Sequence, residues 1–200
     1  MKKLLSLLLL LSFTIKAQDV KIGTQTWTSK NLDVSTYRNG DTIPEVQDKN
    51  VWARLTTGAW CYYDNDAANG TKYGKLYNWY AVIDPSGLAP IGYHIPTDAE
   101  WITLTNYLEG ESEAGLKMKS TRGWQNNGNG TNTSGFEGLP GGYLSIDGNF
   151  KLIGANADWW SSTDTFFDDA WARYLVYESI KVGSYKAYKR KGLSVRCIKD

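Results

Sequence analysis

The alternation of hydrophobic and polar residues is clearest in the last third of the chain. Residues 170–178 alternate with a period of two, with one set being Trp171, Arg173, Leu175 and Tyr177 and the other Ala172, Tyr174 and Val176. A second run follows Gly192, where Leu193, Val195 and Cys197 alternate with Ser194, Arg196 and Ile198. Such a period is typical of strands with two unlike faces. We predict two strands of a mixed or antiparallel sheet.

One segment carries a clear helical period. Trp101, Leu104 and Leu108 are spaced to lie on one face of a helix over residues 97–109, and Gly110 follows as a stop signal. We therefore predict one main helix in the domain.

The start of this helix is marked by local chemistry. Pro96 disfavours the α conformation in the residue before it, which indicates an extended chain up to Thr97. Thr97 is a suitable N-cap, and Glu100 stands three residues later, where its carboxylate can close a capping box. Trp101 then anchors the helix in the core. The whole run, GYHIPTDAEW, is interpreted as scaffold.

Two shorter elements are predicted nearer the N-terminus. Val20 to Trp27 alternates enough to form an opening strand, and Asp48 to Leu55 is interpreted as a helical turn. Between the main helix and the C-terminal strands lies a long polar loop, residues 120–142, rich in Asn and Gly. Aromatic residues make up 14% of the chain and Gly accounts for 20 residues, which indicates a packed, loop-rich protein and not a disordered one.

The first 17 residues have the layout of a secretory signal peptide. Lys2 and Lys3 precede an apolar run from Leu4 to Leu11, and Ala17 offers a small residue for cleavage. The run is shorter than the about 20 residues that a membrane-spanning helix needs. We expect residues 18–200 to form one exported domain without a transmembrane segment, located in the periplasm, on the cell surface or in the medium.

The charge balance argues against nucleic acid as a partner. Removal of residues 1–17 leaves 19 basic and 21 acidic residues, a net charge of −2. Binding to a polyanion needs a basic face. The only local basic run is Lys186, Lys189, Arg190 and Lys191, which we interpret as a solvated hairpin turn.

Several separated motifs together resemble a known family. They are IGTQTW, KNLDV, WCYYDND, YGKLYNWYAV, GYHIPTDAEW, LPGGY, WWSST, AWAR and GLSVRC. In this order they resemble the Fibrobacter succinogenes major paralogous domain from about Val20 to Asp200. The stretch from Leu88 to Ile91 departs from the family, which often has a cysteine before the proline.

The resemblance implies a fold. The family is distantly similar to the formylglycine-generating enzyme and C-type lectin-like group, so it implies a compact α+β, sulfatase-modifying-factor-like fold with both ends of the chain in one sheet. The near-terminal arginine, here Arg196, is a feature that the family shares with this group, and we expect it to have a structural role. Fold does not carry activity. The enzyme uses two nearby cysteines to hold copper, whereas Cys61 and Cys197 stand in separate motifs, and the calcium-dependent lectin motifs are absent.

The two cysteines allow two arrangements. In an oxidising compartment Cys61 and Cys197 can form one disulfide bond. Such a long loop would contribute roughly 4 to 5 kcal/mol in the chain-entropy model. The alternative is a pair of buried free thiols, because cysteine is commonly packed as a small apolar residue.

Metal and catalytic candidates are weak. Asp64 and Asp66 form one acidic cluster and Asp168 and Asp169 another; calcium is the cation that they would suit, but neither has the EF-hand spacing. Solvated turns are the simpler interpretation. His94 is the only histidine and stands without a nucleophile motif, so we expect a packed or hydrogen-bonded residue. We expect no cofactor and no enzyme activity.

Aromatic side chains remain as ligand contacts. Tryptophan can stack on sugar rings or anchor a protein partner. We assign Trp27, Trp79, Trp101 and Trp171 to the core and select as candidate ligand residues Trp124, Asn126, Asn127 and Trp160. The expected function is a noncatalytic surface or extracellular module that binds a glycan or a surface protein. The alternatives are a structural subunit of a surface assembly and a formylglycine-generating-enzyme-like oxidase.

Overall fold

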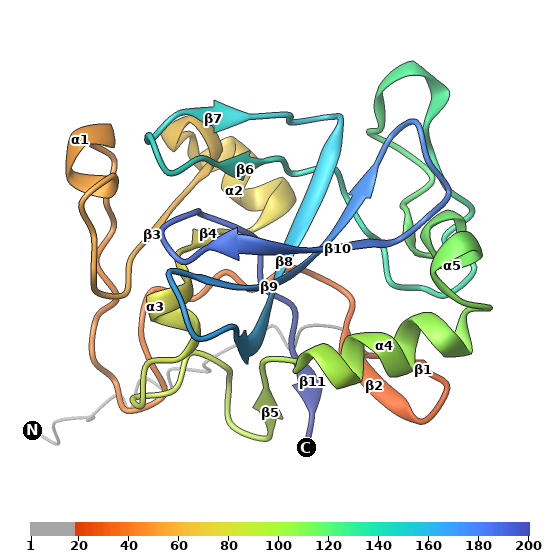
Figure 1. Ribbon diagram of the computed structural model, residues 1–200, viewed down its shortest axis with the longest axis horizontal. Coiled ribbons are helices and arrows are strands. Elements are labelled where there is room, and N and C mark those ends of the chain that lie inside the picture. The colour runs from red at the N-terminus through yellow and green to blue at the C-terminus, as the bar shows by residue number, and fades with distance from the viewer. Residues whose placement is uncertain (1–18) are drawn as a thin grey trace, which may run out of the picture.

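The computed structural model describes residues 19–200, and the predicted signal peptide at residues 1–17 lies outside them. The described chain combines five α-helices with four small sheets in which every pair of named strands is antiparallel (Figure 1). This confirms the α+β class. No helix within this part of the chain has the length and hydrophobicity needed to cross a bilayer.

The two ends of the described chain meet in one sheet. Its strands are β1 (Asp19–Ile22), β2 (Gln25–Thr28), β11 (Ile198–Lys199) and β5 (Tyr93–His94), in that order. The predicted opening strand is a hairpin of two strands, because Gly23 turns the chain with a φ of +61°. A positive φ favours glycine at such a two-residue turn.

A second sheet forms the centre of the molecule. It contains β8 (Asn156–Asp164), β9 (Asp169–Val176) and β10 (Gly183–Tyr188), with β9 in the middle (Figure 1). The strand predicted at residues 170–178 is therefore confirmed as β9. Trp171 is only half-buried, which corrects its assignment to the core.

The prediction of a strand after Gly192 is largely wrong. Only Ile198–Lys199 forms a regular strand, because each of the preceding residues pairs with a different segment of the chain. Leu193 bridges to Tyr77 and Ser194 to Trp159, while Cys197 donates its backbone N–H to the Thr28 side chain. The segment threads between elements that are distant in sequence.

The main predicted helix is confirmed as α4 (Asp98–Tyr107). Thr97 is its N-cap and forms a capping box with Glu100. Asp98, in the first turn, also makes an ion pair of 2.6 Å with the buried Arg173 of β9. The start of α4 is thus fixed both by its own sequence and by the central sheet.

The other helices are short and were mostly not predicted. The predicted turn near residue 50 is α1 (Lys49–Trp52), capped by Asp48. The remaining elements are α2 (Ala67–Tyr73), α3 (Trp79–Val82), α5 (Glu111–Met118), the pair β3 (Trp60–Cys61) and β4 (Leu76–Tyr77), the pair β6 (Tyr143–Leu144) and β7 (Phe150–Lys151), and the 3-10 turns η1 (Tyr63–Asn65) and η2 (Gln125–Asn127).

Aromatic rings join α4 to both sheets. The Trp101 ring lies 4.8 Å from that of Trp27 on β2 and 6.2 Å from that of Trp159 on β8, between ring centroids. Phe136 packs edge-on against all three. Since Trp27, Trp101 and Trp159 are each at most 1% exposed, the prediction that Trp101 anchors the helix is confirmed.

Candidate functional site

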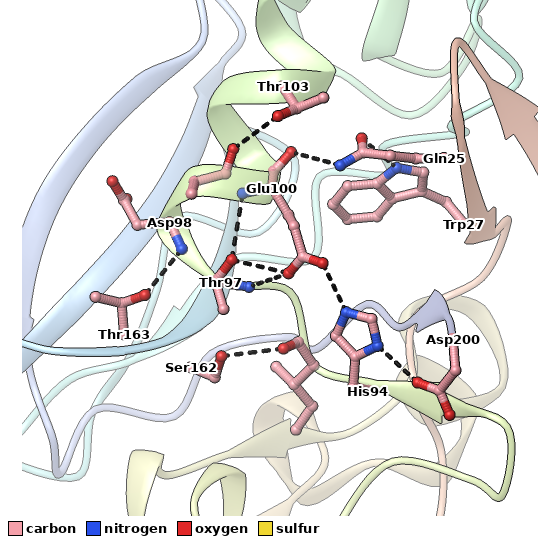
Figure 2. Close-up of polar contacts among 12 residues, drawn as sticks. Gln25, Trp27, His94, Thr97, Asp98, Glu100, Thr103, Ser162, Thr163 and Asp200 are labelled. Carbon is pink, nitrogen blue, oxygen red and sulfur yellow. Dashed lines mark hydrogen bonds and ion pairs between the residues drawn. The ribbon is translucent and has the colours of Figure 1, made fainter.

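His94 lies between two carboxylates at the start of α4 (Figure 2). Its Nδ1 lies 2.7 Å from Oδ1 of Asp200, and its Nε2 lies 2.8 Å from Oε1 of Glu100. Burial alone would lower the pKa of His94, but the hydrogen bonds to Asp200 and Glu100 outweigh it and raise the pKa above 6.5. Because carboxylates only accept hydrogen bonds, this arrangement favours the ring with a proton on both nitrogens, and that form has no lone pair to act as a base. The predicted role of a hydrogen-bonded scaffold residue is confirmed.

The tryptophans predicted to contact a ligand are buried. Trp124 is 5% exposed and Trp160 is fully buried, so the expectation that they offer accessible surface is wrong. The Trp124 Nε1–H donates to the Ser120 hydroxyl and the Gly138 carbonyl, and that of Trp160 donates to the Tyr77 carbonyl. A buried indole is usually held by such a hydrogen bond from its N–H. The polar residues that flank Trp124 along the chain gave no sign that its side chain is buried.

The asparagines of the same loop face solvent. Asn126 and Asn127 are exposed on η2 and adopt left-handed φ values of 49° and 59°. Asparagine tolerates this conformation better than most residues, which is sufficient reason for its presence in a tight turn. Neither residue lines the groove described below.

Two of the four acidic metal candidates, Asp66 and Asp169, accept hydrogen bonds from neighbouring residues. Asp66 accepts a hydrogen bond from the Ala68 N–H at the start of α2, and Asp64 has a φ of 55°. Asp169 accepts from the Thr165 hydroxyl, and Asp168 is exposed. Within residues 19–200 no group of three or more acidic, histidine or cysteine side chains is arranged to hold a metal ion.

The proposed disulfide between Cys61 and Cys197 is not formed. Both residues are free thiols, fully buried in two different hydrophobic clusters, and Cys61 lies opposite Leu76 in the β3–β4 pair. Burial raises the pKa of the Cys197 thiol to about 12 and that of Cys61 well above its ordinary value. The alternative of two buried thiols is the correct one.

The basic run near the C-terminus is not simply solvated. Lys189 makes an ion pair of 2.8 Å with Asp164, and its side chain is 14% exposed. The ammonium group of Lys191 lies 4.5 Å from the centre of the Tyr143 ring and 5.0 Å from that of Tyr185. Lys189 and Lys191 therefore contact neighbouring side chains at the end of β10, which corrects the prediction of a solvated hairpin turn.

A polar groove lies where the segment after β2, helix α2 and the loop at residues 120–142 meet. Two adjoining hollows of about 460 and 370 Å³ share the residues Ser29, Lys30, Arg122 and Glu137. The larger hollow is also lined by Asn31, Asp33, Gly70, Thr71, Lys72, Tyr73, Gly74, Leu139 and Arg196. We call this the Arg196 groove. It is the most enclosed of the hollows described in residues 19–200.

Arg196 forms the floor of the groove and is 1% exposed. Its Nε donates to Asn31 Oδ1 at 2.7 Å, and Nη1 donates to the carbonyls of Thr28 and Phe136, both at 2.7 Å. Nη2 donates to the Glu137 carbonyl at 3.0 Å. Burial lowers the pKa of Arg196 to about 9, which leaves it charged at neutral pH. Its partners are neutral oxygens, so the buried charge has no carboxylate within ion-pair distance in the described chain.

Asn31 is fixed by four neighbours. Its Nδ2 donates to the Tyr73 carbonyl and the Ser194 hydroxyl, at 2.8 and 3.1 Å. Its Oδ1 accepts from Arg196 and, at 2.9 Å, from Trp159 Nε1. A polar residue held in this way has no freedom left to lose when a ligand binds.

The two carboxylates of the larger hollow are already paired. Glu137 accepts from Arg122 at 2.9 Å, and Asp33 accepts from Lys75 at 2.6 Å. The Lys75 ammonium group also lies 4.2 Å from the centre of the Trp60 ring. In the described chain, neither Lys30 nor Lys72 has a carboxylate within 4.0 Å. The groove therefore offers unpaired cations at its rim and on its floor.

Sequence reasoning found Arg196 but not the groove. The available signal was a charged residue inside the apolar alternation of GLSVRC, which indicates a buried cation with dedicated partners. Nothing local to Asn31 or Lys72 indicates that they converge on it, because they stand 165 and 124 positions away in the chain.

Comparison with known proteins identifies the family. No curated protein and no solved structure matches the chain. The family model of the Fibrobacter succinogenes major domain matches residues 20–199, which is nearly all of the described chain. The chain therefore belongs to the Fibrobacter succinogenes major domain family.

Proposed function

We propose that this protein is an exported, noncatalytic surface or extracellular module that binds a glycan or a surface protein in the Arg196 groove. The observation that carries the proposal is the groove itself, an enclosed polar hollow with a buried guanidinium on its floor. Concave sites with a few fixed polar groups are the usual form of small-ligand sites. Export is supported by the signal-peptide pattern of residues 1–17.

The rigidity of the groove supports binding. Asn31 and Arg196 are held by each other and by backbone carbonyls from three separate segments. A ligand that enters meets the Arg196 guanidinium already in position, so little side-chain entropy is lost there on binding.

We also propose that the fold is C-type lectin-like and sulfatase-modifying-factor-like. The pairing of β2 with β11 supports this, because the resemblance implies that both ends of the chain share a sheet.

An oxidase is the weaker alternative. That chemistry would need two neighbouring, accessible thiols, whereas Cys61 and Cys197 are buried in separate clusters. The thiolate is the metal ligand and the nucleophile, and burial opposes its formation in both residues. A structural subunit is the other alternative, and stable homo-oligomers in sizing experiments would favour it.

The test is a binding screen of the purified exported protein against a glycan array and against surface extracts. We expect a ligand whose binding falls at least about tenfold in Lys30→Ala and Arg122→Ala, since each change removes an exposed cation from the groove. Lys181→Ala, exposed and outside the groove, is the matched control. Unchanged binding in both groove variants would move the site elsewhere, and no ligand in either screen would remove the binding function.

A further inference from the structure

We infer that the Arg196 groove binds an acidic saccharide, with a carboxylate of the sugar facing the unpaired cations of Lys30, Lys72 and Arg196. This inference rests on the proposed binding function and adds the chemical class of the ligand. It is carried by the balance of charges in the groove, by the burial of Arg196 and by the polar character of the lining.

The lining carries an excess of positive charge. The larger hollow has the cations Lys30, Lys72, Arg122 and Arg196 against the carboxylates Asp33 and Glu137, a balance of +2. Because Lys75 neutralises Asp33 and Arg122 neutralises Glu137, three cations remain without a carboxylate partner in residues 19–200. The rest of the exported chain is slightly acidic, so this local excess selects an anion at the groove.

The buried charge of Arg196 strengthens the preference of the groove for an anion. A buried guanidinium bonded only to neutral oxygens leaves its charge uncompensated, and the low dielectric around it weakens its field less than water would. Nη2 makes one bond to the Glu137 carbonyl and has a second N–H that no atom of the described chain accepts. An anion placed above Arg196 would therefore lower the free energy of the bound state.

The lining favours a saccharide over an acidic peptide. Tyr73 and Leu139 are the only large apolar side chains among the residues of the larger hollow, and Tyr73 is 6% exposed. Peptides gain most of their affinity from buried apolar anchors or from a sheet edge, and the cationic larger hollow offers neither, because the edge strand β1 lines the second hollow. Sugar hydroxyl groups instead need small polar partners, which Ser29 and Thr71 provide at the groove lining.

The shape of the groove fits a chain of sugar rings. The second hollow continues from Ser29 and Lys30 past Gly135 to Val20 and Asp19. Glycine at position 135 is required there, because its φ is +72° and an added Cβ would lie 2.7 Å from Val20. The ligand can thus extend beyond the cationic end, and we expect an oligosaccharide to bind more tightly than its single acidic sugar.

The experiment compares one acidic oligosaccharide with its neutral form. Oligomers of galacturonic acid and the same oligomers after reduction of their carboxyl groups are titrated calorimetrically into the purified exported protein at low and high salt. We expect the acidic form to bind at least about tenfold more tightly, and the difference to shrink at high salt because the ion pairs at the rim are exposed.

A double variant locates the carboxylate. Lys30→Gln with Lys72→Gln removes two ammonium groups of exposed residues, of which that of Lys72 lies 4.7 Å from the centre of the Tyr73 ring. We expect the fold to be retained, and circular dichroism checks it. We expect the affinity for the acidic oligomer to fall about tenfold, since two partly exposed ion pairs are lost. Affinity for the neutral oligomer should stay the same, and Lys181→Gln should change neither.

The outcomes separate this inference from the proposed function. Equal binding of the acidic and neutral oligomers in the groove would overturn the acidic preference and leave the binding module standing. Binding of polyglutamate as tightly as the acidic oligomer would overturn the choice of a saccharide. If neither oligomer binds while the array and extract screens find another ligand in the groove, the saccharide inference fails alone; if those screens also find none, the proposed function fails with it.

Discussion

At the scale of single residues, Asp158 is the most unusual charge in the core. It is 3% exposed, its Oδ1 accepts a hydrogen bond of 2.9 Å from the Tyr185 hydroxyl, and its Oδ2 has no partner in residues 19–200. Burial raises the pKa of Asp158 from 3.8 to about 6, although Tyr185 and Lys191 oppose the change. The folded state thus holds a proton on this carboxyl group at a pH where the unfolded chain has lost it.

This gives the sign of a pH effect. Because the pKa is raised on folding, the contribution of Asp158 to stability is complete below about pH 4 and is lost as pH rises to about 6, a decrease of about 3 kcal/mol. Asp158→Asn removes the titration. We expect the free energy of unfolding in urea, measured between pH 4 and pH 7, to fall in the wild type relative to the variant. Parallel curves for the two proteins would contradict this interpretation.

At the scale of elements, α4 illustrates how local signals can suffice. The residues that form its cap and its apolar face all lie within residues 97–108. The carboxylate of Glu100 accepts a hydrogen bond from the Thr97 N–H at 2.8 Å. Helix α5 lacks such signals. Its N-cap, Gly110, has no side chain to cap the helix. A position on its buried face is Gly115, where a Cβ would lie 2.5 Å from the Ile180 carbonyl oxygen. A helix whose buried face contains glycine gives little periodic pattern to read.

The cap can be tested within the same helix. Thr97→Ala removes the side-chain acceptor of the Glu100 N–H, and we expect a loss of about 1 kcal/mol in the free energy of unfolding. Thr103→Ala is the matched control, since Thr103 is exposed on the same helix and caps nothing. Chemical denaturation measures both variants. Equal losses would mean that the cap contributes no more than an ordinary helical threonine.

At the scale of the whole molecule, Arg196 links segments that the sequence keeps far apart. Its hydrogen bonds join the residues after β2, the loop at Phe136 and Glu137, and the C-terminal segment. Because all these partners are backbone carbonyls or a fixed amide, the side chain determines how the loop sits on the sheet. The hydrogen bonds of Arg196 therefore both form the floor of the groove and hold the distant segments of the fold together.

The substitution Arg196→Met tests how far the stability of the fold depends on these hydrogen bonds. The change leaves buried carbonyl oxygens of Thr28 and Phe136 without this donor, and we expect a loss of about 3 to 5 kcal/mol in the free energy of unfolding. Lys199→Met is the control in the same C-terminal segment, because its ion pair with Asp19 is long, at 3.9 Å, and its side chain is exposed. A cost below about 1 kcal/mol for Arg196→Met would show that the carbonyls find other partners.

The sequence by itself determined the features that depend on neighbours along the chain. The capping box of α4, the alternation of β9 and the contact of His94 with Glu100 follow from residues within a few positions of one another. The α+β class and the family follow from such motifs taken together. These predictions succeeded because the interactions concerned act over one turn or one strand.

Only the tertiary structure decided which polar-looking residues are buried and which meet. Trp124 and Trp160 turn inward because the Gly138 and Tyr77 carbonyls accept their indole N–H groups. Cys61 and Cys197 stay apart in different clusters, and Asn31, Lys72 and Arg196 converge on one groove. Burial and convergence depend on contacts between distant segments, and no period within a single segment encodes them.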